Sequence, residues 1–441
     1  MEYRTLLSLA LISKRARKEP KLKFTSLAHL LNVEFLRGCY FSLGKGRACG
    51  IDEISWEAYG INLEENLASL VARMKSKRYK PLPAKRVYIP KGNNEMRPLG
   101  LPSLEDKIVQ KGIAQILEAI YETDFLNCSY GFRPKRSCHQ ALKAVDKSIM
   151  VNRVNYVIEA DIKGFFDNVS HEWMMKFLAV RIKDPSLLLL IRKFLKAGYI
   201  DQGQLVLAKE GTPQGGNLSP ILSNIFLHYV LDLWFEAVVK TYVKSECSMV
   251  RYADDFTCMV KDASDAKRIE QALRNRFAKF GLELHPEKTQ TISFGRFEKE
   301  RARKQQRRCN TFDFLGFTHY CGKSRKNTFI VGRKTSSKKF RQKLADMTKW
   351  LKDIRDVKKC KLWWPTLISK LRGHYQYYGV SGNSRSINLF YYKVERAAFK
   401  WLNRCSQKTR FNWTGFREYL LHYPLPKPRI MHSFYKTSNV T

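Results

Sequence analysis

Apolar residues recur at the three- and four-residue spacing of helices along much of the 441-residue chain. One helix has a clear beginning, because Ser103 is followed by two acidic residues in the next turn. Another has a clear end at Gly281. The pattern predicts helices within residues 1–50, over 63–77, over 103–125, through about residue 196, after a Gly-rich loop at 211–220, and over 265–281.

Four segments have the pattern of strands. "AKRVYIPKGNNEMRPLGLP" predicts two strands around the polar turn "KGNNE". "NYVIEADIKGFFDNV" begins as a strand, and "SMVRYADDFTCMV" is typical of a strand, a turn and a second strand. "TFDFLGFTHY" predicts one further strand.

The character of the chain changes near its last quarter. Three helical stretches rich in Lys, Arg, Trp and Tyr are expected at about 336–356, 361–378 and 385–405. We therefore predict a domain boundary near 322–335. Upstream, the segment 296–308, "RFEKERARKQQRR", has seven basic residues and two acids, and we expect it to be an exposed insertion.

The charge balance indicates the partner. Lys and Arg total 80 against 40 acids, which gives a formal net charge of +40 spread over the whole length. A chain this basic repels itself unless a polyanion neutralises it, so we predict a nucleic-acid partner. The alternatives are a generic basic protein and a membrane-surface binder.

The cysteines and the N-terminal segment indicate the cellular compartment in which the protein is expected. None of the ten cysteines forms a CxxC pair, so no zinc or redox motif is present and a reduced, intracellular compartment is expected. "TLLSLALI" is too short to span a membrane, and its basic residues follow it instead of preceding it. We expect no membrane partner and a cytoplasmic, bacterial-type location.

Three aspartates, Asp161, Asp254 and Asp255, each lie at the end of an apolar, strand-like run. Strand ends at one edge of a sheet can bring distant carboxylates together. Neighbouring strand residues point to opposite faces, so Asp254 and Asp255 need a hairpin tip if both are to serve one site.

Close carboxylates repel one another and raise their own pKa values, and a divalent cation removes that conflict. Oxygen ligands suit Mg²⁺, and two such ions about 4 Å apart would activate a hydroxyl and stabilise a leaving oxygen. The alternative is an ordinary turn with two solvated aspartates.

Three other features favour a catalytic site, and each has a structural alternative. Gln214 lies in "GTPQGGNLSP", where two glycines permit close backbone approach to a ligand, or where a loop simply precedes a helix. Lys91 and Arg97 flank a hairpin turn and could grip a triphosphate, or could be solvated. Phe166 could contact the 2′ position of a sugar, or could be a core aromatic.

Taken together, "RPLGLP", "SYGFRPKRSCHQAL", "ADIKGFFD", "GTPQGGNLSP", "YADD", "GLELHPEKT", "FLGF" and "KLRGHYQYYGV" occur in an order that resembles reverse transcriptases. The nearest resemblance is to the group II intron-encoded reverse transcriptase and maturase family. It runs from about residue 45 nearly to the end, and the set of motifs is specific although each one alone is weak.

The resemblance implies roles for individual residues. Asp161, Asp254 and Asp255 match the metal-binding aspartates, the third being more often supporting than ligating. Lys91 and Arg97 match residues that contact the triphosphate, Phe166 the gate against ribonucleotides, and Gln214 a residue near the incoming nucleotide. The primer grip would be Phe314, Leu315, Gly316 and Phe317, and "CGID" at 49–52 matches a template-contacting motif.

The implied fold is α+β, a right-hand polymerase of fingers, palm and thumb with an α-helical C-terminal region. We expect an N-terminal helical extension at 1–50, fingers and palm at 51–325, a thumb or maturase domain at 326–410 and a short tail at 411–441. No metal-type Cys or His cluster appears in that tail, so no endonuclease activity is expected.

The implied function is RNA-directed DNA polymerisation with two Mg²⁺ ions, for which Mn²⁺ could substitute. Its partners would be an RNA template, a DNA or RNA primer, deoxynucleoside triphosphates and a structured intron RNA, with the oligomeric state left open. One alternative is a non-enzymatic maturase that binds RNA and assists splicing. Another is a host-recruited reverse transcriptase in repair or defence.

Overall fold

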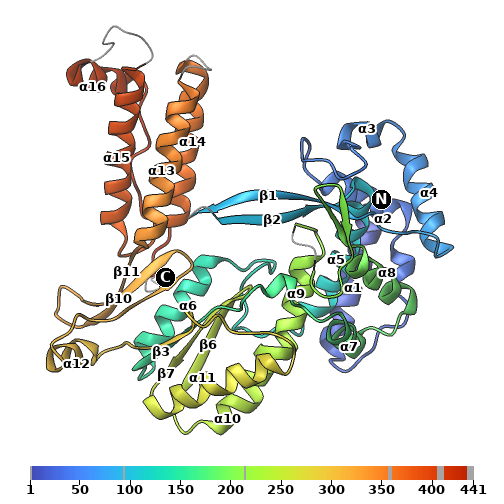
Figure 1. The fold of residues 1–441 in the computed structure, drawn as a ribbon, viewed down its shortest axis with the longest axis horizontal. Helices are drawn as coiled ribbons and strands as arrows, with labels where there is room; N and C mark the ends of the chain where they lie inside the picture. Colours follow the sequence, from blue (N-terminus) through green and yellow to red (C-terminus); the bar gives the residue numbers. More distant parts are fainter. Residues whose placement is uncertain (1, 93–94, 213–214, 356–359, 405–411, 435–441) are drawn as a thin grey trace. The chain divides into compact units, whose positions relative to one another are not determined.

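The computed structural model describes residues 2–92, 95–212, 215–355, 360–404 and 412–434 (Figure 1). The chain divides into two compact units. The first comprises Met1–Ser137, Ala160–Cys258 and Ser264–Gln290, and the second comprises Cys138–Glu159, Met259–Ala263 and Thr291–Thr441. The predicted domain limits differ from this division and stay a prediction.

The N-terminal part of the first unit is helical, as predicted. Its central helix is α5 (Leu104–Tyr121), which is buried along most of its length and packs against other helices. Ser103 caps α5 by accepting a hydrogen bond from the Asp106 backbone N–H at 3.2 Å, which confirms the predicted start. The surrounding helices are α1 (Glu2–Lys18), η1 (Ala28–Leu30), α2 (Val33–Ser42), α3 (Trp56–Ile61) and α4 (Leu63–Lys75).

The predicted hairpin before α5 is confirmed (Figure 1). Strands β1 (Ala84–Gly92) and β2 (Glu95–Leu101) pair antiparallel, with Ile89 opposite Arg97. β1 also pairs in parallel with β4 (Tyr199–Asp201), which is joined to β5 (Gln204–Val206). The four strands form a sheet of order β2-β1-β4-β5.

A long apolar helical run follows the Gly-rich loop. It consists of α9 (Ser219–Leu227), the π-helical segments η3 (His228–Asp232) and η4 (Phe235–Val239), and α10 (Lys240–Tyr242). By length and composition this run could cross a membrane, but 67% of its most apolar window is buried inside the protein. That burial is typical of a core helix. The other helices here are η2 (Phe165–Asp167), α7 (His171–Arg181), α8 (Pro185–Lys196) and α11 (Ala263–Ala278).

A second four-stranded sheet has the order β6-β7-β3-β8. Its strands are β3 (Tyr156–Ala160), β6 (Cys247–Tyr252), β7 (Asp255–Val260) and β8 (Gln290–Ser293). The strand, turn and strand predicted around "YADD" are β6, the turn at 253–254 and β7. Nearly all of β7 is buried, so its first residue is a boundary between core and solvent.

The second unit contains a three-stranded sheet of order β11-β10-β9 and helix α6 (Cys138–Val151). The single strand predicted over "TFDFLGFTHY" is wrong. It is two strands, β9 (Thr311–Phe314) and β10 (Phe317–Lys323), joined by Leu315 and Gly316. Both turn residues have positive φ, +49° and +78°, as two-residue hairpins of this twist require. Strand β11 (Phe329–Thr335) completes the sheet.

Most residues of the segment 296–308 are exposed, as expected, but the segment is partly anchored in the core. It contains helix α12 (Glu298–Lys304), in which Glu298 and Ala302 are buried. The Glu298 carboxylate accepts hydrogen bonds from Ser293 Oγ at 2.6 Å and from the Arg307 guanidinium. Composition alone could not predict this contact, because the segment is basic overall and its one buried acid does not stand out.

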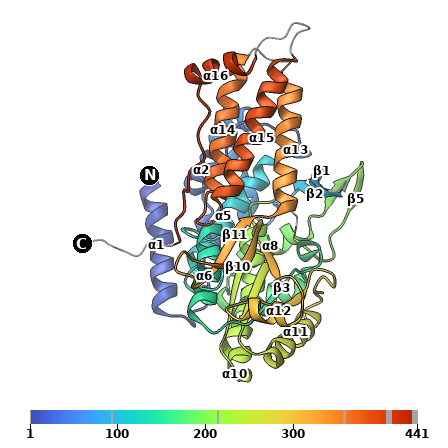
Figure 2. The same ribbon diagram turned by 90° about the vertical axis from the view of Figure 1, so that its left-hand side faces the viewer.

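The three predicted C-terminal helices are confirmed within a few residues as α13 (Ser337–Ile354), α14 (Cys360–Tyr378) and α15 (Ser384–Leu402). They run side by side in both ribbon views (Figures 1 and 2). A shorter helix, α16 (Trp413–His422), follows, and Phe416 on it packs against Phe399 of α15.

Asp184 provides a test of how the N-terminal extension is attached. Its carboxylate accepts backbone N–H groups of Leu27 and Ala28 at 2.6 and 2.7 Å, and of Ser186 and Leu187 at 2.9 and 3.1 Å. Burial raises the pKa of Asp184, but these four donors outweigh it and hold that pKa below its ordinary value. We expect Asp184→Ala to lower the free energy of unfolding by about 3 kcal/mol at pH 7.

The pH dependence follows from the lowered pKa of Asp184. The stabilisation is complete above the unfolded pKa and is lost as the pH falls through the lower, folded pKa. Chemical denaturation of wild type and Asp184→Asn should therefore show a difference at pH 7 that shrinks below about pH 4. A difference that does not change with pH would contradict a charge-based role. The exposed Asp262 supplies the control, Asp262→Asn, which should not alter the free energy of unfolding.

Candidate active site

The turn between β6 and β7 carries the aspartate pair. Ala253 and Asp254 are the two turn residues, and Asp255 begins β7. Ala253 has φ of +59°, a left-handed conformation that is uncommon for a residue other than glycine. A two-residue turn with positive φ at its first position suits the twist of paired strands. The turn therefore presents Asp254 at the tip, instead of pointing it to one face of a strand.

Asp161 follows β3 directly and is half-buried. Its backbone carbonyl accepts a hydrogen bond from the His285 N–H at 2.8 Å, which brings the segment after α11 beside it. From that segment, Lys288 Nζ lies 2.6 Å from Asp161 Oδ2. The carboxylate of Asp161 thus has a cationic partner within the chain.

The charge of Asp161 acts on Asp254. Burial raises the pKa of Asp254 above its ordinary value, and the negative charge of Asp161 raises that pKa further. Arg97 and Arg251 act in the opposite direction. Asp161, Asp254 and Arg97 are therefore within electrostatic reach of one another, although they are far apart in the sequence.

The third aspartate is placed differently, because Asp255 is exposed at the start of β7. Within the part of the chain that the structure describes, no three Asp, Glu, His or Cys side chains converge as metal ligands would. The pair Asp161 and Asp254 nevertheless offers only carboxylate oxygens, the donor type that Mg²⁺ prefers. Their mutual repulsion is the conflict that a cation relieves, so the donor set fits a divalent ion.

The other residues assigned to nucleotide binding vary in how far they are described. Arg97 is an exposed residue of β2. Lys91 lies on β1, but its side chain is outside the described residues, as is Gln214 altogether. Phe166 is half-buried, its ring edge-on to Phe165 at 5.4 Å.

The Gly-rich loop begins against the segment that carries Phe166. The Thr212 backbone N–H donates to the Phe166 carbonyl at 2.7 Å. A Cβ on Gly211, whose φ is +90°, would lie 2.9 Å from that same carbonyl oxygen. Glycine is therefore required where the loop starts, and the loop start is fixed beside Phe166.

The residues assigned to the primer grip belong to the second unit. Leu315 and Gly316 form the turn between β9 and β10, flanked by the buried Phe314 and Phe317. The Tyr377 hydroxyl donates to the Leu315 carbonyl at 3.0 Å, so the turn is tied to α14.

Two groups at the site were missed by reasoning from the sequence. Lys288 had a signal in "GLELHPEKT", a motif noted without a role for its lysine. Arg251 precedes "YADD" and is completely buried, with a guanidinium whose charge lowers the pKa of Asp254. An arginine on an apolar strand was the available signal for that second group.

The chain is similar to known proteins over about half of its length. The reverse transcriptase (RNA-dependent DNA polymerase) family matches residues 89–319. The group II intron-encoded protein LtrA of Lactococcus lactis is 39% identical over 235 residues, which is 52% of this chain and 39% of LtrA. Protein YkfC of Escherichia coli is 39% identical over 240 residues, 48% of this chain and 63% of YkfC.

A telomerase structure from Candida albicans, in complex with a telomeric RNA fragment, covers 83% of this chain and 65% of its own at 16% identity, with a TM-score of 0.43. The present chain thus spans only part of the length of the relatives it matches. The family match and the mixture of helices and sheets with a helical C-terminal region confirm the predicted α+β, right-hand polymerase fold. The chain belongs to the reverse transcriptase (RNA-dependent DNA polymerase) family, and its relatives within that family include a group II intron-encoded protein.

Proposed function

We propose that this protein is an RNA-directed DNA polymerase that extends a primer on an RNA template. The observation that carries the proposal is the pair Asp161 and Asp254, which lie at neighbouring strand ends, where the charge of Asp161 raises the pKa of Asp254. Family membership supports the same reaction class. Nucleotidyl transfer depends mostly on positioning and charge neutralisation, and this pair with Arg97 suits both.

Asp161 and Asp254 would hold Mg²⁺, with Asp255 in a supporting role and Mn²⁺ able to substitute. When bound, such ions activate the attacking hydroxyl and stabilise the leaving oxygen. Arg97 would bind the triphosphate of the incoming deoxynucleotide, since a guanidinium matches phosphate oxygens in charge and geometry. Lys288 would shield the charge of Asp161 before substrate arrives, because its ammonium already lies at the carboxylate.

The proposed polymeric partners are an RNA template, a DNA or RNA primer and a structured intron RNA. The net charge of +40 supports binding to phosphate backbones, and the basic helices α13, α14 and α15 supply part of that charge. An A-form duplex is recognised mainly through its shape, phosphates and 2′-hydroxyls, so such binding requires little sequence readout. The reduced, cytoplasmic location also remains a proposal.

A second function, assistance to intron splicing, is favoured by the names of several relatives. One is "Nuclear intron maturase 4, mitochondrial" of Arabidopsis thaliana, 29% identical over 130 residues, which is 29% of this chain and 16% of that protein. Splicing assistance needs RNA binding and does not need the carboxylates. Acceleration of intron splicing that survives loss of Asp254 would support this role beside polymerisation.

Asp254→Asn should reduce DNA synthesis at least about a hundredfold, because it removes the charge that would hold a cation at the hairpin tip. RNA binding should stay within about twofold, since no basic contact is lost. The measurement is primer extension on an RNA template with deoxynucleotides and Mg²⁺, with affinity for the primer–template measured in parallel. Asp262→Asn, an exposed aspartate just beyond the other end of β7, is the matched control and should keep wild-type synthesis. Equal loss of synthesis and binding in Asp254→Asn would count against the assigned role.

Phe166→Ala should increase ribonucleotide incorporation, because the ring would no longer exclude a 2′-hydroxyl. We expect the ratio of kcat/KM for deoxynucleotide over ribonucleotide to fall roughly tenfold to a hundredfold. Phe166→Tyr retains the ring and should retain the ratio. An unchanged ratio in Phe166→Ala would return this residue to a packing role beside Phe165.

A further inference from the structure

Arg251 is a fully buried arginine one residue before the "YADD" motif begins. All five of its N–H donors have partners. Nε and one terminal nitrogen donate to the two carboxylate oxygens of Asp232, and that nitrogen also reaches Ser129 Oγ at 2.8 Å. The other terminal nitrogen donates to Asn224 Oδ1 at 3.1 Å and to the Ala253 carbonyl at 2.9 Å.

The last of these bonds reaches the hairpin tip itself. Ala253 is the turn residue before Asp254, so the guanidinium holds the peptide that links the strained residue to the candidate ligand. A bond from a charged donor is stronger than a neutral one, and burial keeps water from competing for it.

The partners of Arg251 come from the long apolar helix. Asn224 is on α9 and Asp232 is the last residue of the π-helical segment η3. Residues eight apart in a regular α-helix lie on the same side but about 80° apart around the axis. A π segment has more residues per turn, and π segments often mark functional sites. Here it lets Asn224 and Asp232 contact the same guanidinium.

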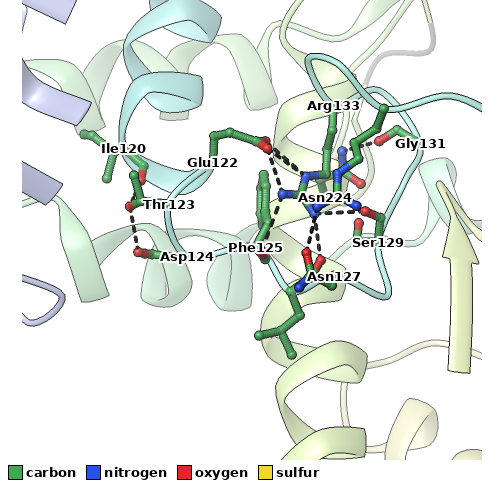
Figure 3. Close-up of polar contacts among 12 residues, drawn as sticks. Ile120, Glu122, Thr123, Asp124, Phe125, Asn127, Ser129, Gly131, Arg133 and Asn224 are labelled. Atoms are coloured by element: carbon green, nitrogen blue, oxygen red, sulfur yellow. Dashed lines mark hydrogen bonds and ion pairs between the residues drawn. The ribbon is translucent and has the colours of Figure 1, made fainter. Parts of the chain in front are cut away.

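A second buried arginine, Arg133, fixes the loop at 125–131, which packs on the other side of Arg251. Arg133 donates to the Glu122 carboxylate and to the carbonyls of Leu126 and Ser129, at 2.7 and 2.9 Å (Figure 3). These bonds fold the loop at 125–131 so that Ser129 faces Arg251. Figure 3 also shows Asn224, whose amide donates to the Gly131 carbonyl at 2.8 Å.

The loop at 125–131 then packs closely against the hairpin tip. A Cβ on Gly131 would lie 2.3 Å from the Ala253 backbone nitrogen, closer than atoms of a side chain and a backbone approach. The guanidinium therefore bonds the Ala253 carbonyl, while the loop backbone leaves no room for a side chain beside the Ala253 nitrogen.

We propose that Arg251 is a positioning residue of the polymerase site, which acts with Asp232, Asn224 and the 125–131 loop to fix the Ala253–Asp254 turn. The inference rests on the proposed function and deepens it. Arg251 touches no substrate on this view. Its guanidinium sets where the Asp254 carboxylate lies, and a displacement of about 1 Å at a reacting centre can reduce a rate a hundredfold.

Arg251→Lys is the test variant, because lysine retains the positive charge opposite Asp232 but cannot make the five-donor fork. Arg181→Lys is the matched control. Arg181 is likewise buried, ion-paired with Asp124 at 3.2 Å, and donates to the Ala16 carbonyl at 3.1 Å near the C-terminal end of α1. Arg181→Lys is therefore the same substitution at a buried ion pair that does not contact the hairpin tip.

Both full-length variants are compared with wild type in thermal unfolding, primer–template affinity, single-nucleotide extension, and hydrogen–deuterium exchange of peptides covering residues 248–260. For Arg251→Lys we expect kcat to fall tenfold to a hundredfold while KM for deoxynucleotide and primer–template affinity change less than about threefold. Exchange at the turn should become faster. Arg181→Lys should lose comparable thermal stability yet keep kcat within about twofold and exchange at the turn unchanged.

The inference is overturned if folded Arg251→Lys keeps wild-type kcat, or if Arg181→Lys loses kcat equally. Should Arg251→Lys not fold, Arg251→Gln with Asp232→Asn removes both buried charges together and leaves neither unpaired. That double variant should show the same selective loss of kcat, and normal kcat in it would refute the role of Arg251. Failure of the proposed function gives another result, since wild type itself would then make no DNA.

Discussion

The buried charge of Arg251 is the constraint on which the candidate site depends. A guanidinium with no exposure to water must have an anionic partner and hydrogen bonds for every donor, or the folded state would be strongly destabilised. Asp232, equally buried, supplies the charge. Satisfying the remaining donors requires Asn224 and Ser129 to arrive from two other elements. The cost of leaving this charge unpaired therefore ties a helix, a loop and a hairpin to a single arrangement.

The same site shows why acids are tolerated in so basic a chain. Asp254 is pushed toward its neutral form by burial and by Asp161, and is drawn toward its charged form by two arginines. Asp161 has an ammonium group at hydrogen-bonding distance. Cationic groups of the chain therefore offset part of the charge of both carboxylates, and the raised pKa of Asp254 shows the part that a bound cation would still relieve. The surplus of 40 positive charges, by contrast, needs compensation from outside the chain, which the proposed nucleic-acid partner would provide.

Local pattern was sufficient for most of the elements. The hairpin before α5, the cap at Ser103, the strand–turn–strand at "YADD" and the three basic helices each depend on residues close in sequence, where periodicity and turn chemistry act. The errors arose where tertiary contacts decide. The turn at Leu315 was missed because leucine rarely adopts positive φ, and here a tyrosine on α14 bonds its carbonyl. The burial of Glu298 depends on Arg307 and Ser293, which composition cannot pair.

The candidate site likewise contains residues that the sequence predicts and residues that only the folded structure brings into place. The aspartates could be predicted from the sequence, because acids at the ends of apolar runs are unusual. The roles of Arg251 and Lys288 could not be predicted in this way. The bond from Arg251 to the Ala253 carbonyl and the approach of Lys288 to Asp161 exist only after the chain has folded. Among 80 basic residues, the sequence offered only weak signals for these two, namely the motif that contains Lys288 and the position of Arg251 on an apolar strand.

Two small residues, Ala253 at the hairpin tip and Gly131 in the loop beside it, determine how tightly the turn is packed. Ala253 occupies a left-handed conformation that would suit glycine, while Gly131 occupies a place defined by lack of space. The strain at Ala253 costs about 1–2 kcal/mol. The charge-assisted bond to its carbonyl contributes about 1.5–3 kcal/mol, which is enough to offset that strain. Alanine also restricts the turn more than glycine would, because it has fewer backbone conformations to visit. A strained but restricted turn, bonded at its carbonyl and crowded at its nitrogen, keeps the following carboxylate in one place, and a site that works mainly by positioning needs that property most.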